Sequence, residues 1–518
     1  ENRVSVALTA NTNGAAVLGG SAIVQASGGI ARFADVRVQK AGSSYQLVAN
    51  STGLLGSMSQ PFDILPGPAN RLLFTSQPGN AVAGGAIKTF SVEIRDAVGN
   101  RVPNASNTVA VALDANPSAA TLSGAVRVQP VDGKATFTAL TIDKAGVGFA
   151  IIAGAPGLAS ATSENFSVRN PIFFSNSAAG YFHSCAIDTA GAAHCWGENG
   201  AGQLGITQTG QFALPEPVQG GLTFEKIAAG RDHSCALTAK GTAYCWGANG
   251  LGQLGSGGSG SFTPRPVTGD LVLSDLSAGY VHSCGVTSTG KGYCWGEGQT
   301  GALGQGSSAN AAQPVPVSGD LQFAGIGAGR YFTCGVTTDG VGYCWGDNTF
   351  GQLGNGTKSQ RAEPSVISGN LTFTTVIAGG FHSCGLTTAG AAYCWGRNSW
   401  GQLGNGNQTD TAVPVAVAGG HVFKSITAGN RHNCGLTAEG DAYCWGDNSN
   451  YHLGIGTSQP TSPLPLLVVG GHTFASISAG RFHTCAVTPQ QEVYCWGTLG
   501  GSLGDGGTVT SNVPVRVR

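Results

Sequence analysis

The stretch HSCAIDTAGAAHCWG, residues 183–197, places two histidines, two cysteines and a tryptophan within fifteen positions. Residues of these types can bind zinc or carry out thiol–disulfide exchange. The stretch HSCALTAKGTAYCWG, residues 233–247, repeats the same spacing fifty positions later. Such recurrence indicates a repeated structural unit rather than a single chemical site.

The spacing of the two cysteines within each copy favours a disulfide. Zinc-binding pairs are usually about two to four residues apart and redox pairs have the form C-x-x-C, whereas ten positions and a turn separate these cysteines. A three-residue turn over 189–191, with its glycine left-handed, would pair Asp188 with Ala192 and so place Cys185 opposite Cys195. Opposed Cβ atoms in a hairpin lie ~4.5–5.5 Å apart, close to what a disulfide requires. We expect structural disulfides; free thiols and metal ligands are the alternatives.

Seven copies of the motif follow one another at intervals of 49 to 51 residues and use all fourteen cysteines. Seven bridges would indicate an oxidising compartment. In the seventh copy Gln491 stands at the turn-glycine position, so we expect its hairpin to be the most strained. The expected disulfides are Cys185–Cys195, Cys235–Cys245, Cys284–Cys294, Cys334–Cys344, Cys384–Cys394, Cys434–Cys444 and Cys485–Cys495.

The recurring histidine is better explained by packing or hydrogen bonding than by catalysis or ligand binding. The fourth copy has Phe332 at this position, and a catalytic or ligand role would not survive phenylalanine in one of seven equivalent units. The histidines are His183, His233, His282, His382, His432 and His483.

The repeat predicts an all-β fold, a seven-bladed β-propeller over residues 171–518, with one four-stranded blade per repeat. One copy contains four short strand-like segments, at 314–317, 321–329, 333–338 and 342–346. The tail NVPVRVR resembles the first of these segments but has no blade after it, and the first repeat begins without such a strand. We therefore expect the C-terminal strand to close the ring by completing the first blade.

The composition argues against several functional classes. The net charge is -1, charged residues make up only 10% of the chain, and no basic patch indicates nucleic-acid binding. No apolar run approaches the roughly 18 residues of a membrane helix. The sequence shows no P-loop, no H-E-x-x-H motif and no G-x-S-x-G nucleophile elbow, and no position is acidic in every repeat. We expect no cofactor, no metal and no catalytic residue, and thus a protein that is not an enzyme.

Two halves of the motif carry a family resemblance. IAAGRDHSCAL (227–237) and WGANGLGQLG (246–255) recur in register and are similar to the regulator of chromosome condensation repeat family. The resemblance covers 171–518 and implies a seven-bladed propeller that binds other proteins through one face. Cysteine stands where members of that family usually carry an aliphatic residue, which suggests a secreted, bacterial branch.

Residues 67–170 read as a β-sandwich of short alternating strands and resemble the immunoglobulin-like domains of bacterial surface proteins. Residues 1–66 read as an incomplete second copy, because ENRVSVAL (1–8) matches SNTVAVAL (106–113) and the counterpart of 67–105 is missing. Two explanations stay open: truncation, or completion by a strand of another chain, which would allow self-assembly.

A binding face is expected where two residues between the recurring Ala-Gly and the histidine position differ from blade to blade. These positions are rich in aromatic residues and arginine, the types that dominate interface hot spots, and would form a ring at one end of the propeller. The alternative is that some of the rings only pack between blades. The candidates are Tyr181, Phe182, Arg231, Asp232, Tyr280, Arg330, Tyr331, Phe381, Arg431, Arg481 and Phe482, with Phe350 and Trp400 added from the segments that precede GQLG.

Together these patterns predict an extracellular or bacterial cell-surface binding or adhesion protein. An immunoglobulin-like stalk would carry a propeller that binds a protein or a glycan. One alternative is a self-assembling fibre or surface-layer subunit. The other is a secreted carbohydrate-active propeller enzyme.

The disulfide assignment makes a chemical prediction. The protein unfolded without reductant should show almost no reactive thiol, because every cysteine is bonded. A thiol titration with a chromogenic disulfide reagent measures this. A titre approaching fourteen per chain would overturn both the disulfides and the inference of export.

Overall fold

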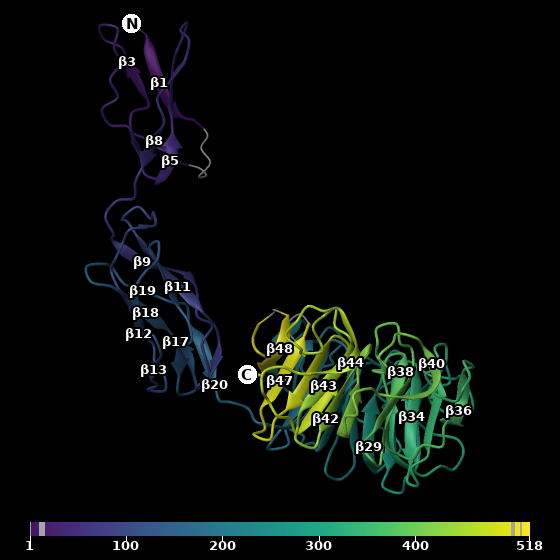
Figure 1. Ribbon diagram of the computed structural model, residues 1–518. Helices are drawn as coiled ribbons and strands as arrows, with labels where there is room; N and C mark the ends of the chain where they lie inside the picture. The colour runs from purple at the N-terminus through teal and green to yellow at the C-terminus, as the bar shows by residue number, and fades with distance from the viewer. Residues whose placement is uncertain (1, 10–15, 499–502, 508–509) are drawn as a thin grey trace. The chain divides into compact units, whose positions relative to one another are not determined.

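The computed structural model describes residues 2–9, 16–498, 503–507 and 510–518. The chain forms two compact units, Glu1–Pro171 and Ile172–Arg518, and the all-β prediction is confirmed. Figure 1 shows the strands of both units. Within the described residues, no helix has the length and apolar character needed to cross a membrane.

Residues 67–170 contain two principal sheets whose side chains share one buried core. Phe90, Val92, Phe137 and Ile151 are almost completely buried in it. The strand Lys134–Phe137 alternates exposed and buried residues, as a strand with one buried face should. The immunoglobulin-like assignment stays a prediction. The sheets have the orders β15-β11-β9 and β14-β12-β18-β19, with β9 (Arg71–Ser76), β11 (Phe90–Arg95), β12 (Val109–Leu113), β14 (Arg127–Val128), β15 (Lys134–Phe137), β18 (Ile151–Gly154) and β19 (Ala161–Thr162). Two further sheets have the orders β10-β20-β17 and β13-β16, with β10 (Ala81–Val82), β13 (Leu122–Ser123), β16 (Thr141–Ile142), β17 (Gly146–Phe149) and β20 (Phe166–Arg169).

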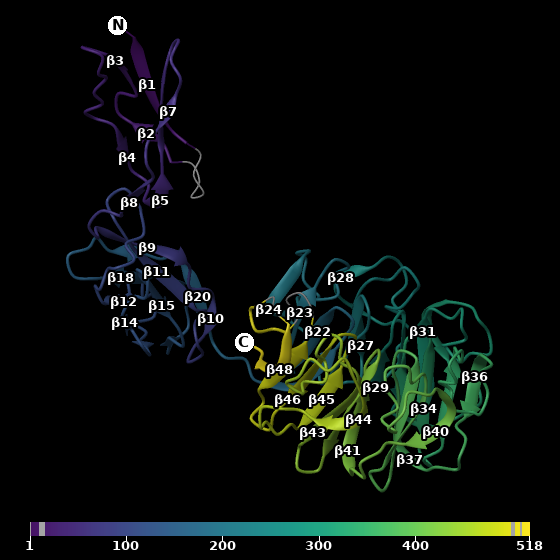
Figure 2. The same cartoon turned by 45° about the horizontal axis from the view of Figure 1, so that its top comes forward.

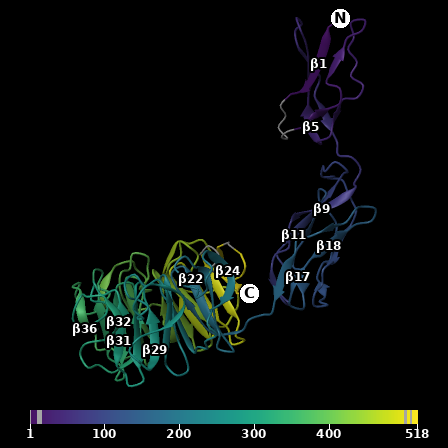
Figure 3. The same ribbon diagram turned by 180° about the vertical axis from the view of Figure 1, so that it is seen from behind.

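Residues 1–66 form one four-stranded sheet, β3-β1-β6-β7, and two two-stranded sheets, β2-β4 and β5-β8 (Figure 3). Tyr45 is the one fully buried large side chain among the described residues of this segment, whereas Leu54, Leu55 and Met58 are exposed. Completion by a strand of another chain stays a prediction. The strands are β1 (Arg3–Leu8), β2 (Leu18–Gly19), β3 (Ile23–Gln25), β4 (Arg37–Val38), β5 (Gly42–Tyr45), β6 (Leu47–Ser51), β7 (Ser57–Met58) and β8 (Phe62–Ile64).

The second unit is the expected seven-bladed propeller (Figure 2), and each blade consists of four consecutive antiparallel strands. Blades one to three contain β21 (Phe174–Ala179), β22 (His183–Asp188), β23 (Ala193–Glu198) and β24 (Gln211–Pro217); β25 (Lys226–Ala229), β26 (His233–Leu237), β27 (Ala243–Gly247) and β28 (Ser261–Pro266); β29 (Leu273–Ala278), β30 (His282–Thr287), β31 (Gly292–Gly296) and β32 (Ala311–Pro316). Blades four and five contain β33 (Phe323–Ala328), β34 (Phe332–Thr337), β35 (Gly342–Gly346) and β36 (Arg361–Val366); β37 (Phe373–Ala378), β38 (His382–Thr387), β39 (Ala392–Gly396) and β40 (Thr411–Ala416). Blades six and seven contain β41 (Phe423–Ala428), β42 (His432–Thr437), β43 (Ala442–Asp447) and β44 (Thr461–Leu467); β45 (Ser476–Ala479), β46 (His483–Val487), β47 (Val493–Gly497) and β48 (Ser511–Arg516).

The expectation that the tail completes the first blade is wrong. The C-terminal strand β48 pairs with β47 of the last blade, where Val515 lies opposite Cys495. The first blade is completed by its own β24, with Glu216 opposite Cys195. The PVPV-like segment is thus the fourth strand of the blade before it, and the ring closes without a strand shared between its ends.

Side-chain packing closes the ring instead. The tryptophan of each Cys-Trp-Gly lies in the core of the preceding blade; for example, Trp246 packs with the Cys185–Cys195 disulfide. The same contact joins the two ends, because Trp196 of blade one packs with Cys485 and Cys495 of blade seven. Each disulfide therefore also forms part of the surface that its neighbour packs against.

Neighbouring blades approach each other closely at the glycine that follows each inner strand, and we call these seven glycines the collar. They are Gly180, Gly230, Gly279, Gly329, Gly379, Gly429 and Gly480. The amide of Tyr181 donates to the carbonyl of Gly230 (3.0 Å), and the amide of Arg481 donates to Gly180 across the ring closure (3.1 Å). These carbonyls lie so close that a Cβ on Gly429 would stand 2.3 Å from the carbonyl oxygen of Gly480. Only glycine fits at this approach.

The hairpin turns follow the predicted geometry. Gly191 has a φ of 87°, and the amide of Asp188 donates to the carbonyl of Ala192 (2.8 Å). In blade seven Gln491 takes the same left-handed conformation, with a φ of 64°, at the cost that a side chain brings there. The sequence thus correctly located the one hairpin with a non-glycine residue at this turn position.

The collar predicts a large difference between two Gly→Ala substitutions. Gly429→Ala should lower the free energy of unfolding by about 1–3 kcal/mol, because the new Cβ forces adjacent blades apart. Gly250→Ala is the matched control, since a Cβ there meets nothing within 4 Å and its backbone φ is not positive. Denaturant titration of both variants checks this. Equal effects would mean that the collar tolerates a side chain.

Candidate functional site

The fourteen cysteines are structural. The predicted pairing is confirmed in all seven blades, with Cys185 directly opposite Cys195 and Cα–Cα distances of 4.0 to 4.1 Å. All fourteen are fully buried. Over the ranges that the structure describes, no group of three or more His, Cys, Asp or Glu residues could hold a metal ion. Seven disulfides indicate an oxidising, extracellular environment.

The recurring histidines tie one blade to the next. The Nε2 atom of His183 lies 2.7 Å from the Ser234 hydroxyl, which donates to the carbonyl of Gln203 (2.9 Å). Because the hydroxyl uses its only proton on that carbonyl, the histidine must donate from Nε2. Trp246 donates to the same carbonyl (2.9 Å).

Blade five supports the same assignment with a different partner. His382 Nε2 lies 2.9 Å from the side-chain oxygen of Asn433, which can only accept a hydrogen bond. The asparagine amide donates to the carbonyl of Gln402, the counterpart of Gln203. In blade three, His282 contacts Thr333 (2.9 Å). Blade four has Phe332 at the histidine position, fully buried, so the position accepts an apolar ring.

Burial holds these histidines neutral. It lowers the pKa of His183, His233 and His483 to about 3. It lowers the pKa of His282 and His382 to about 4. Near neutral pH none of them can act as a general acid, and their Nε2 protons are already used in the seams between blades.

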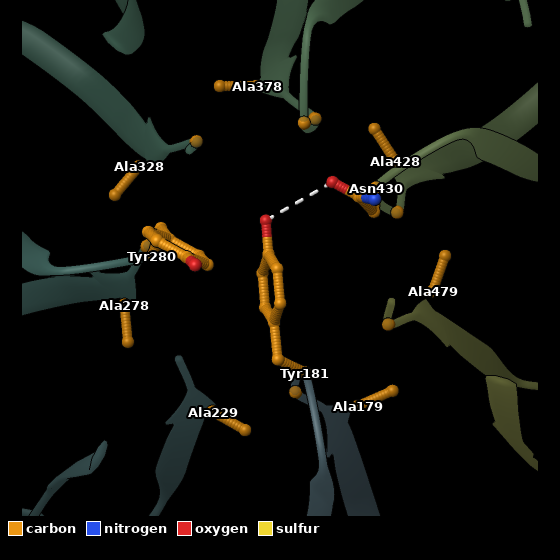
Figure 4. A pocket seen from close by; sticks show the side chains of 17 residues that line it. Ala179, Tyr181, Ala229, Ala278, Tyr280, Ala328, Ala378, Ala428, Asn430 and Ala479 are labelled. Atoms are coloured by element: carbon orange, nitrogen blue, oxygen red, sulfur yellow. Dashed lines mark hydrogen bonds between the residues drawn. The ribbon is translucent and has the colours of Figure 1, made fainter. Parts of the chain in front are cut away.

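The predicted binding residues gather at the end of the propeller where the inner strands finish. Most of them come one or two positions after a collar glycine. Tyr181 and Tyr280 line a cavity of about 90 Å³, together with alanines, glycines and Asn430. Figure 4 shows Tyr181 pointing into this cavity, where its hydroxyl donates to the side-chain oxygen of Asn430 (3.3 Å). Tyr280 meets the Tyr181 ring edge to face, with centroids 4.9 Å apart. We call this end of the propeller, where the thirteen predicted binding residues lie, the axial face.

Arginines lie against the aromatic rings of the axial face. The Arg330 guanidinium lies 5.0 Å from the ring centroid of Tyr280 and 4.7 Å from that of Phe381. Arg481 lies 4.9 Å from Phe182 and 4.3 Å from Phe482. Such contacts hold long cationic side chains in place beside exposed rings. All thirteen predicted face residues are partly exposed. The two arginines described in this paragraph pack against the rings named with them.

Phe350 and Trp400, the two candidates from the segments that precede GQLG, contact other residues of the axial face. Trp400 lies between two guanidiniums, at 4.2 Å from Arg397 and 4.1 Å from Arg431. Phe350 contacts Phe381 edge to face, with centroids 5.5 Å apart. Sequence reasoning missed Arg397, and it recognised Asn430 as a variable ring position without choosing it as a binding residue. The available signal for Arg397 was that the position after each Cys-Trp-Gly also varies between blades.

The charges on the axial face are unequally compensated. Arg231 forms an ion pair with Asp232 (3.0 Å), and Arg431 lies 3.8 Å from Asp447. Burial raises the pKa of Asp232, and Arg231 opposes that shift. Arg330 and Arg481 form no ion pair with any residue in the described part of the chain.

The repeats match profiles of the regulator of chromosome condensation (RCC1) repeat at residues 190–253 and 289–487, which is half of the chain. The chain belongs to the RCC1 repeat family. No curated protein sequence matches it. Human WBSCR16 is similar in structure, with 23% identity and a TM-score of 0.57 over 65% of this chain and 92% of that one.

Two yeast structures show the same RCC1 fold. RCC1 (Prp20) bound to Kap60 is 22% identical, with a TM-score of 0.57 over 67% of this chain and 85% of that one. Prp20p from Saccharomyces cerevisiae, described with its binding properties to Gsp1p and histones, is 22% identical, with a TM-score of 0.58 over 67% and 87%. At this identity the likeness establishes the fold.

The buried histidines predict acid sensitivity of the RCC1 propeller. Their folded pKa values lie below the unfolded value of about 6.5, so the unfolded chain binds more protons and stability is lost as pH falls from about 6.5 toward 4. His282→Phe, which copies Phe332, should reduce this loss by up to about 1.4 kcal/mol per pH unit. Denaturant unfolding of both proteins between pH 7 and pH 4 measures the difference. Identical slopes would show that His282 does not stay neutral in the fold.

Proposed function

We propose that this RCC1 propeller is the protein-binding domain of an exported protein and that the axial face is its recognition surface. The observation that carries the proposal is the convergence of partly exposed aromatic and arginine side chains on one end. They occupy positions that differ between blades, while the residues beneath them recur. This arrangement lets a repeated scaffold present one asymmetric surface.

The face has the properties of an interface hot spot. Tyr331, Phe482 and Trp400 are partly exposed rings, and arginines packed on each of them restrict their movement. Aromatic residues and arginine dominate binding energy at interfaces, and side chains already held in place lose less entropy on binding. The yeast structures support a protein ligand by analogy, because one is bound to Kap60 and the other is described as binding Gsp1p and histones.

A binding role also accounts for the chemistry of the face better than catalysis does. The recurring histidines are buried and used between blades, and Asp232 is paired with Arg231. We therefore infer that the propeller is not an enzyme.

The location follows from the disulfides. We propose that the protein acts outside the cell or on a bacterial cell surface, where seven disulfides persist. In this proposal the first unit serves as a stalk. Adhesion to a protein surface is the activity that best uses such a stalk and a rigid binding face.

The test is an affinity measurement on two matched sets of variants. A partner captured from the producing culture should bind the triple variant Tyr331→Ala, Phe482→Ala, Trp400→Ala more weakly by about a hundredfold or more, since hot-spot truncations each cost about 2 kcal/mol or more. The control Lys240→Ala, Asp339→Ala, Glu439→Ala changes exposed residues in the hairpin turns at the opposite end of the blades. It should leave affinity unchanged.

Surface plasmon resonance with the purified partner measures both sets, and the melting temperature shows that both remain folded. Loss of binding only in the control set would place the site at the opposite end. A polysaccharide as the captured ligand, with turnover, would replace the binding role by the enzymatic one.

A further inference from the structure

The arginines of the axial face differ in whether they form an ion pair. Arg231 is neutralised by Asp232 at 3.0 Å, and Arg431 has Asp447 at 3.8 Å. Asp447 is only 2% exposed and so presents almost no negative charge to a ligand. Among the described residues, neither Arg330 nor Arg481 has a carboxylate within ion-pair distance, although the charge of Arg481 also acts on Asp232.

These two guanidiniums lie near the propeller axis. Burial raises the pKa of Tyr181, which points into the central cavity, and the charges of Arg330 and Arg481 oppose that shift. Arg330 lies 5.0 Å from the ring centroid of Tyr280, and that ring contacts the Tyr181 ring, with centroids 4.9 Å apart. Arg481 lies 5.7 Å from the centroid of the Tyr181 ring.

The two arginines are held in place but incompletely satisfied. Arg330 packs on Tyr280, Tyr331 and Phe381, and its Nε atom is buried without a hydrogen-bond partner among the described residues. Burial lowers the pKa of Arg481. A guanidinium that has already lost part of its hydration gains most from an anion, which it can bind through two parallel hydrogen bonds.

We propose that the axial face recognises an acidic segment of its partner protein, with aspartate or glutamate carboxylates paired to Arg330 and Arg481. This deepens the proposed function and rests on it, because it names the chemistry of the partner at the same face. The rings of Tyr331 and Phe482 stand beside the two guanidiniums. They accept apolar side chains that alternate with the carboxylates, a combination that a polypeptide provides.

The first test needs no substitution in the protein. The probes are two fluorescein-labelled peptides, Gly-Asp-Phe-Asp-Phe-Asp-Gly and the same peptide with asparagine in place of each aspartate. Fluorescence anisotropy should show the acidic peptide binding about tenfold or more tightly at low salt, a difference of about 1.4 kcal/mol. The preference should shrink at high salt, because exposed charges are screened. Equal binding, or no binding of the acidic peptide, overturns the inference.

The second test locates the charges. Arg330→Gln and Arg481→Gln should each weaken the acidic peptide about tenfold and leave the asparagine peptide unchanged. The control Arg361→Gln removes an exposed arginine from the outer strand β36 and should have no effect. Melting temperatures show whether each variant is folded. If a variant unfolds, Arg330→Lys, which keeps the charge but loses the planar group, should retain part of the preference.

Two further outcomes separate the inference from the function on which it rests. If the triple alanine variant loses its partner while both peptides bind alike, the face binds a protein but does not select acidic segments. If a heparin-derived hexasaccharide binds through Arg330 and Arg481 and the acidic peptide does not, the anion is carried by a glycan and the inference fails.

Discussion

The propeller depends on one contact that is made at the seams between blades. A polar side chain in the second strand of one blade accepts a hydrogen bond from the histidine of the preceding blade. The same side chain donates to a backbone carbonyl in the GQLG-type loop of that preceding blade. At the first seam these groups are His183, Ser234 and the carbonyl of Gln203. The carbonyl also accepts the Trp246 indole proton. A ring without a shared closing strand must obtain its cohesion from such seams, and His483 repeats the contact with Ser184 where the chain ends meet.

The seam also explains the composition of the motif. A hydroxyl or amide can satisfy both neighbours, which is why serine, threonine and asparagine exchange at this position. The histidine is useful for its Nε2 donor and its flat shape, and Phe332 keeps the shape alone. The disulfide lies in the same buried layer, where the next blade's tryptophan covers it. A motif that looks like a chemical site is therefore the repeated joint of a scaffold.

The side chains that directly follow the collar glycines take no part in these seam contacts, so they can differ from blade to blade. Tyr181 and Gly380 occupy equivalent positions in blades one and five and differ completely in size. A Cβ on Gly380 would stand 2.3 Å from Asn430, whose side chain accepts the Tyr181 hydroxyl proton. Variation at one blade is thus matched by variation at its neighbours. The result is one asymmetric surface in which unpaired arginines stand beside aromatic rings.

The sequence by itself determined the features that depend on neighbouring residues. The cysteine pairing, the turn glycines and the position of Gln491 in place of a turn glycine follow from hairpin geometry, which is local. The number of blades follows from counting repeats. The candidate face could also be predicted, because equivalent positions in a repeat lie at equivalent places. Tertiary structure alone decided that the tail joins the last blade, that the collar requires glycine and that Arg397 and Arg431 enclose Trp400. The tail pairs with a strand that is near it in the chain, a choice that the repeat pattern left open. The closure of the ring instead joins segments that are distant in the chain, as in the contact of Cys485 with Ser184 across 301 positions. No local pattern encodes such a contact, since it exists only once the ring has closed.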